Sequence, residues 1–232
     1  MIDSDIKLWV HSIFESISGE AGGIPQGTWV TIVRLQGCNL DCSWCDAKEA
    51  AEIWMDRERA LSVEEIVGEV GRLRNRHVLI TGGEPLLQTG LMELLDRLSK
   101  QGYIIQVETN GSMIIPYFRK IHWVMDYKCP SSNMTLEMLP VEVIGCMLKE
   151  QQDGGGSIVV KFVIADDQDL KCATEVMLGL DDCGYLGNFL LSPINADPKI
   201  LTSIPAMIKY RCPDLLWRTI LSIQVHKLVG LS

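Results

Sequence analysis

The chain has 232 residues, of which 47% are hydrophobic, and it carries a formal net charge of −9 at pH 7. This length suits one α/β domain over residues 1–232, and the negative charge argues against partners such as nucleic acid or an anionic membrane. No apolar run reaches the ~18 residues that a membrane-spanning helix needs, and the first residues lack a signal-peptide pattern. We therefore expect a cytoplasmic protein.

Predicted strands and helices alternate along the chain. Runs rich in β-branched and aromatic residues predict strands at residues 6–14, 29–36, 77–81, 103–109, 123–126, 158–165, 188–191 and 220–226. Helices are predicted after a capping box at Ser62 and Glu65, over residues 91–98 and 170–180, and more weakly near 200–210. This alternation predicts an α/β fold with parallel strands and right-handed crossovers.

Polar and glycine-rich residues follow one predicted strand after another. They lie at residues 37–46, 81–85, 108–111, 126–128 and 192–195. In parallel α/β folds, ligands bind beyond the carboxyl ends of the strands, where such segments meet. The sequence therefore predicts one site assembled from segments that are distant along the chain.

Three cysteines lie close together in the first of these segments. Cys38, Cys42 and Cys45 have the spacing C-x3-C-x2-C, and none of the other five cysteines forms a second pair nearby. A structural zinc site normally has four ligands, and so does a four-iron cluster. Three thiolates would leave one iron of a cluster open to a small molecule. We favour such a cluster; a zinc site and packed free thiols are the alternatives.

The segment Gly82-Gly83-Glu84-Pro85 adds a second motif after a later strand. Glycines let the backbone approach a ligand closely, a carboxylate can accept hydrogen bonds from an ammonium group, and proline fixes the end of the turn. Together with the cysteine spacing, this pattern resembles the radical S-adenosylmethionine (SAM) superfamily. The resemblance implies a shortened, partial β/α barrel and a [4Fe-4S] cluster. It also implies that the amino and carboxylate groups of SAM occupy the open iron and that SAM supplies a 5′-deoxyadenosyl radical.

Further segments resemble the 7-carboxy-7-deazaguanine synthase family. They are SIFESISGE (12–20), TIVRLQGCNLDCSWCD (31–46), LITGGEPLLQ (79–88), VETNGS (107–112), DYKCPSS (126–132), VKFVI (160–164), LSP (191–193) and QVHK (224–227). The resemblance implies a carbon–nitrogen lyase of queuosine and 7-deazapurine biosynthesis. It would convert 6-carboxy-5,6,7,8-tetrahydropterin to 7-carboxy-7-deazaguanine with loss of ammonia. It also implies a homodimer and a reductant such as flavodoxin or ferredoxin.

The same resemblance assigns roles to individual residues. The cluster ligands would be Cys38, Cys42 and Cys45. The residues that bind SAM would be Gly83, Glu84, Glu108, Asn110, Asp126, Tyr127, Lys128, Ser192, Pro193, Ile194 and Asn195. The substrate would contact Ile17, Ser18, Gly19, Arg34, Thr81 and Ser232. No side chain is assigned as the catalyst itself, because the radical comes from SAM.

The chain departs from the family pattern at the magnesium site. The family uses Mg²⁺, with a serine or threonine hydroxyl two residues after the third cysteine as a ligand, but this chain has Ala47 there. Alanine offers no oxygen to a hard cation. We expect either binding through substrate, water and another group such as Asp46, or a different cation or none.

Two other functions remain open from the sequence. A radical SAM activase, which generates a glycyl radical on a partner protein, shares the cysteine spacing. A non-enzymatic zinc module could use the three cysteines as a structural clip.

Overall fold

The strands of the computed structural model form one curved sheet. The structure describes residues 6–52, 60–152, 157–225 and 230. The described strands are β1 (Lys7–Ile17), β2 (Trp29–Leu35), β3 (Ala60–Ser62), β4 (His77–Gly82), β5 (Ile104–Thr109), β6 (Ile121–Tyr127), β7 (Ser157–Ile164), β8 (Phe189–Pro193) and β9 (Thr219–Leu221). They form a nine-stranded sheet in the order β3-β1-β2-β4-β5-β6-β7-β8-β9.

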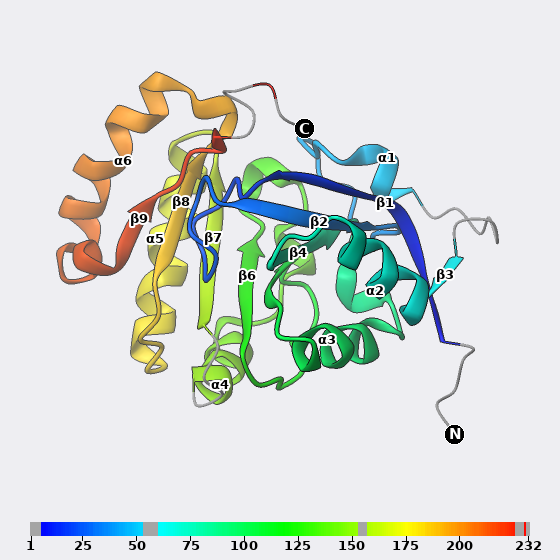
Figure 1. Cartoon of the computed structure of the whole chain (residues 1–232). Coiled ribbons are helices and arrows are strands. Elements are labelled where there is room, and N and C mark those ends of the chain that lie inside the picture. The colour runs from blue at the N-terminus through cyan, green and yellow to red at the C-terminus, as the bar shows by residue number, and fades with distance from the viewer. Residues whose placement is uncertain (1–5, 53–59, 153–156, 226–229, 231–232) are drawn as a thin grey trace.

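The strands from β2 to β9 in this order are parallel, as the sequence predicts, but those at the β3 end are not. β1 pairs antiparallel with β2, and β3 pairs antiparallel with β1. The reason lies in the connection between β1 and β2, which closes as a hairpin: Ser18 N–H donates to Thr28 O, and Gly27 N–H donates to Ser18 O. The prediction of parallel strands is therefore wrong for this edge. The remaining strands curve into the partial β/α barrel that we expected (Figure 1).

Helices cover the outer face of the sheet, except for the short α1, which lies on the other side of β1 and β2 (Figure 1). They are α1 (Lys48–Ala51), α2 (Val63–Arg72), α3 (Leu91–Lys100), α4 (Val141–Gln152), α5 (Asp167–Asp182) and α6 (Pro198–Arg211). α2 begins at the predicted capping box, in which Ser62 Oγ accepts from Glu65 N–H and the Glu65 carboxylate accepts from Ser62 N–H. Among the described residues, no helix is long and apolar enough to cross a membrane.

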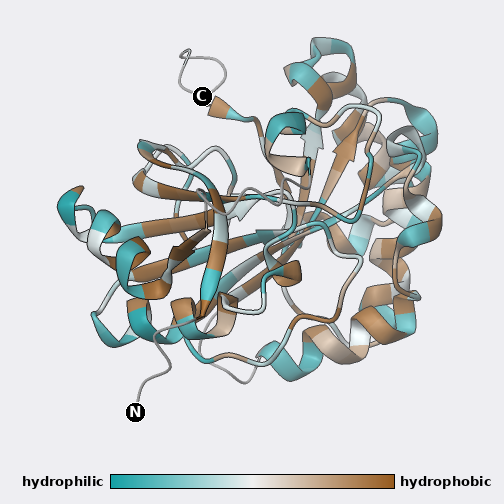
Figure 2. Cartoon of the chain, turned by 90° about the vertical axis from the view of Figure 1, so that its right-hand side faces the viewer, coloured by the Kyte–Doolittle hydropathy of each residue, from teal (hydrophilic) through white to brown (hydrophobic). Residues whose placement is uncertain are grey.

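The two faces of the strands differ in chemistry. On β4, Val78 and Ile80 join the large core beneath the helices, whereas Leu79 packs on the inner face. On β6, Trp123 and Met125 belong to the same large core, whereas Val124 packs on the inner face. The helices that cover this core contain both hydrophobic and hydrophilic residues, as the colours of Figure 2 show. The helices therefore bury one face of the sheet, and the inner face remains for a site.

Several further features differ from the sequence prediction or are absent from it, and the short α1 and β3 are among those that were not predicted. The strand predicted over residues 220–226 is only the three-residue β9, and residue 226 lies outside the described part of the chain. The chain crosses from β5 to β6 without a helix, and Ile115 of this crossover packs into the core where a helix would. Helix α4 was not predicted at all.

Candidate active site

A cavity of about 790 Å³ lies at the carboxyl ends of the parallel strands. This volume is large enough for more than one small molecule. Of the residues that the sequence predicts for the site, it is lined by Ile17, Gly19, Arg34, Cys38, Cys42, Cys45, Thr81, Gly83, Glu108, Asn110, Asp126, Lys128, Ser192, Pro193, Ile194 and Asn195. The structure thus brings together segments from β1 to β8 around one space.

The cysteine loop follows β2 and is tied to α1, since Cys38 N–H donates to Ala51 O at 3.0 Å. Two N–H groups point at the first thiol: Leu40 N lies 3.4 Å and Asn110 Nδ2 lies 3.6 Å from Cys38 Sγ. Burial raises the pKa of the Cys42 thiol to about 11. Metal binding at such a thiol releases its proton. Hydrogen bonds to sulfur are one of the means by which proteins tune iron–sulfur clusters.

The Gly82-Gly83 turn packs directly on the start of the cysteine loop. A Cβ atom on Gly83 would lie 2.1 Å from Gly37 O, a contact that no side chain tolerates. The backbones are joined by Glu84 N–H, which donates to Gly37 O at 2.8 Å. Glycine is therefore required at residue 83 because two backbones meet there, and their contact fixes the cysteine loop relative to β4.

Glu84 is placed differently from the prediction. Its side chain is fully buried and does not line the cavity. The carboxylate accepts hydrogen bonds from Leu86 N at 2.9 Å, Thr109 Oγ1 at 2.8 Å and Asn110 N at 2.6 Å. Burial raises the pKa of Glu84, and these hydrogen bonds act against that rise. We therefore correct the expected role of this side chain: it links the ends of β4 and β5 and does not face an ammonium group of a ligand.

Two further predicted residues, Tyr127 and Ser18, do not line the cavity. The Tyr127 ring lies in the core on the helix side of the sheet, 5.8 Å from the Phe162 ring, and its burial raises the pKa of the hydroxyl to about 12. Ser18 is fully buried, and its hydroxyl donates to Glu20 O at 3.1 Å. Side-chain contact of Tyr127 or Ser18 with a ligand in the cavity is thus contrary to the structure. Ser232 lies outside the described residues.

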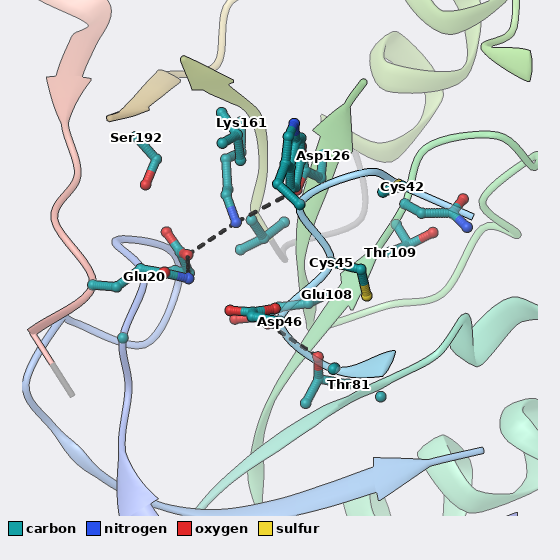
Figure 3. Close-up of a pocket in the computed structure, with 18 of the residues that line it drawn as sticks. Glu20, Cys42, Cys45, Asp46, Thr81, Glu108, Thr109, Asp126, Lys161 and Ser192 are labelled. Atoms are coloured by element: carbon teal, nitrogen blue, oxygen red, sulfur yellow. Dashed lines mark hydrogen bonds and ion pairs between the residues drawn. The ribbon is translucent and has the colours of Figure 1, made fainter. Parts of the chain in front are cut away.

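The structure adds two charged residues that the sequence analysis missed. Lys161 of β7 and Glu20, which follows the β1 end, both line the cavity and form an ion pair with 2.9 Å between Nζ and Oε1. Lys161 Nζ also lies 3.5 Å from Asp126 Oδ2, so one ammonium group bridges two carboxylates (Figure 3). Gln224 Nε2 and Ser222 Oγ donate to the same glutamate at 2.9 and 3.1 Å.

This network sets the protonation of the cavity wall. Burial alone would lower the pKa of Lys161, but the Glu20, Asp126 and Glu108 carboxylates raise it above its ordinary value, so the side chain is an ammonium ion. Glu108 accepts from Thr81 Oγ1 at 3.1 Å. Burial, together with the nearby Glu20 carboxylate, raises the pKa of Glu108 to about 7. The cavity therefore holds a fixed positive charge and a carboxyl group that titrates near neutral pH.

The residues around the cysteines fit an iron–sulfur cluster with a bound ligand. Cys38, Cys42 and Cys45 face one cavity, and Asp126 Oδ1 is a buried oxygen without a hydrogen-bond partner among the described residues. Within the same part of the chain, no three His, Cys, Asp or Glu side chains form a group that could hold a single metal ion. A four-iron cluster does not need three side chains that converge on one metal ion, because each thiolate binds its own iron.

The sheet, the three-cysteine loop and the cavity beside it define a radical SAM protein, and the family model described as "Radical SAM superfamily" matches residues 32–144. The chain is 32% identical to the 7-carboxy-7-deazaguanine synthase of Clostridium acetobutylicum, over 93% of each chain. It is 36% identical to the Haemophilus influenzae protein of the same name, over 96% of this chain and 93% of that one.

The chain therefore belongs to the 7-carboxy-7-deazaguanine synthase family. Among solved structures it is similar in fold to QueE from Escherichia coli, with a TM-score of 0.69 and 23% identity over 94% of both chains. Membership in this family sets aside the activase and the zinc module.

Proposed function

We propose that this chain converts 6-carboxy-5,6,7,8-tetrahydropterin to 7-carboxy-7-deazaguanine and ammonia, as a radical SAM lyase of 7-deazapurine biosynthesis that leads to queuosine. The observation that carries this proposal is the identity of 32% to 36% with synthases of this name, which extends over nearly the whole chain. The cavity supports it, because the three cysteines and a set of polar groups for a second molecule line the same space.

The SAM end of the cavity is the wall beside the cysteines. Cys38, Cys42 and Cys45 would hold the cluster, and when bound, the cluster and SAM supply the 5′-deoxyadenosyl radical that takes hydrogen from the substrate. Asp126 Oδ1 has no hydrogen-bond partner in the described part of the chain and can accept a hydrogen bond from the cofactor. The segment Ser192–Asn195 also lines the cavity and can contact the rest of SAM. Gly83, where two backbones meet, lines the same space.

The substrate end contains the groups suited to a carboxylated pterin. Arg34 lines the cavity from β2 with its guanidinium stacked 5.1 Å from the Phe14 ring centre, and it can bind the substrate carboxylate through two parallel hydrogen bonds. Thr81 lies beside it in the register of β2 and β4. Glu108, with a pKa of about 7, can hold or release a proton on its carboxyl oxygen as ammonia is lost.

This chain offers Mg²⁺ fewer protein ligands than the family pattern does. Ala47 lines the cavity and offers no side-chain oxygen, so the protein ligand expected there is absent. We propose that turnover depends only weakly on Mg²⁺. Turnover measured with EDTA and with added Mg²⁺ tests this point, and strict dependence restored by Mg²⁺ alone would contradict it. If turnover does depend strictly on Mg²⁺, the substitution Ala47→Thr should change that dependence little.

The proposal includes partners and a location. A low-potential one-electron donor such as flavodoxin or ferredoxin would reduce the cluster, and the active form would be a homodimer of single-domain chains. A cytoplasmic location agrees with the eight cysteines, all of which are free thiols in the structure.

The decisive experiment is an anaerobic assay of reconstituted protein with SAM, a reductant and the carboxypterin. We expect 7-carboxy-7-deazaguanine and ammonia in equal amounts, without any protein partner, and no product from Cys42→Ala. Wild-type protein that carries the cluster and cleaves SAM but leaves the pterin unchanged would overturn the proposed reaction.

A further inference from the structure

The loop between the second and third cluster cysteines is attached to the chain that follows β6. Ser43 N donates to Ser132 O at 3.1 Å, and Trp44 Nε1 donates to Ser131 Oγ at 3.0 Å. Ser131 itself belongs to the 3₁₀ helix η3 (Pro130–Ser132), and its N–H donates to the Asp169 carboxylate at 2.8 Å. Trp44 is thus held between two cluster cysteines by a rigid neighbour.

A charged pair lies directly against this tryptophan. Lys128 Nζ lies 5.0 Å from the centre of the Trp44 ring and 2.9 Å from Asp126 Oδ2. The Lys128 side chain is 9% exposed and the Asp126 side chain 14%, so little water screens either charge. Both residues line the same cavity as the three cysteines.

The two charges have opposite signs, so they act on a cluster in opposite ways. The contact with Trp44 places the Lys128 ammonium against the loop between Cys42 and Cys45, and the Asp126 carboxylate is paired with that ammonium.

We propose that Lys128 and Asp126 set the reduction potential of the cluster and that the charge of Lys128 makes reduction easier. Reduction adds one electron from a low-potential donor and no proton, so the cluster with its three thiolates becomes more negative by one charge. A buried ammonium nearby stabilises the reduced state, and a buried carboxylate destabilises it. This inference rests on the cluster of the proposed function and adds a role that is separate from any contact with SAM.

The test is a redox titration of reconstituted protein in the absence of SAM, followed by electron paramagnetic resonance. Lys128→Met should lower the midpoint potential. Removal of one buried unit charge near the cluster should change the reduction equilibrium on the order of tenfold, which is about 59 mV for one electron. Asp126→Asn should move the potential in the opposite direction.

Two controls separate this role from loss of structure or of ligand binding. Lys128→Arg keeps the charge and should leave the potential close to that of the wild type. Lys171→Met removes an exposed lysine of α5 and should not shift it. Unchanged potentials in both Lys128→Met and Asp126→Asn, or shifts of the same sign, would overturn the inference while leaving the proposed reaction intact. If Lys128→Met fails to load a cluster, Asp126→Asn alone tests the inference: a raised potential supports it, and an unchanged or lowered potential contradicts it. Wild-type protein without a cluster would contradict both proposals.

Discussion

The titration of Glu108 gives a stability prediction with a definite sign. In the folded protein the pKa of Glu108 is raised from 4.5 to about 7, first by burial and then by the Glu20 carboxylate. Between these two values the folded state holds a proton that the unfolded chain has lost. The free energy of unfolding must therefore fall as the pH rises from about 4.5 to about 7, and the loss persists above pH 7.

The size of the effect follows from the same two values. Each tenfold change in proton affinity corresponds to about 1.4 kcal/mol, so the upper bound is about 3 kcal/mol. Water that enters the cavity screens the carboxylate, so we expect about 2 kcal/mol. Glu108→Gln can keep the hydrogen bond from Thr81 Oγ1 and removes only the titration.

The assay is urea unfolding of the reduced, cluster-free protein at pH 4.5 and pH 8. Glu108→Gln should be more stable than the wild type by about 2 kcal/mol at pH 8 and nearly equal to it at pH 4.5. Glu142→Gln on the exposed side of α4 serves as the control and should behave as the wild type at both pH values. A difference between Glu108→Gln and the wild type that is the same at both pH values would refute the reasoning.

Three other substitutions test the site. Gly83→Ala puts a methyl group 2.1 Å from Gly37 O, so the iron bound per chain after reconstitution should fall severalfold; wild-type iron content would speak against the close backbone approach. Glu84→Ala leaves three donors unpaired, two of them buried, and should cost about 3 kcal/mol in urea unfolding, whereas a cost below about 1 kcal/mol would argue against its linking role. Lys161→Met leaves Glu20 buried without its cation and should destabilise by about 3–5 kcal/mol, and unchanged stability would show that the ion pair is dispensable.

The sequence predicts most of the fold because two local signals are strong, the short apolar runs of the strands and the apolar stripes of the helices. The strands are short, apolar and separated by helical stripes, so the parallel part of the sheet follows from their alternation. Helix α4 was missed because Gly145 near its middle looks like a break in a helix. In the structure this glycine allows α4 to pack closely on α5, since a Cβ there would lie 2.4 Å from Cys183 Cβ. Such a packing role cannot be read from one sequence.

The site was predicted where motifs lie at strand ends and missed where charges meet across the chain. A lysine inside the apolar run VVKFVI is a sequence signal that a buried partner exists, because a buried ammonium group needs a carboxylate. Its partner Glu20 lies 141 residues away, and no local pattern connects the two. Glu84 shows the opposite error, because its place in a motif says nothing about which way its side chain points.

The central claim is that three cysteines leave one iron open for the amino acid end of SAM. Electron–nuclear double resonance on the reduced cluster, with SAM labelled with nitrogen-15 in its amino group, tests this directly. The account predicts a hyperfine coupling between the label and the cluster in wild-type protein. A fully loaded cluster that shows no such coupling when SAM is in excess would contradict it.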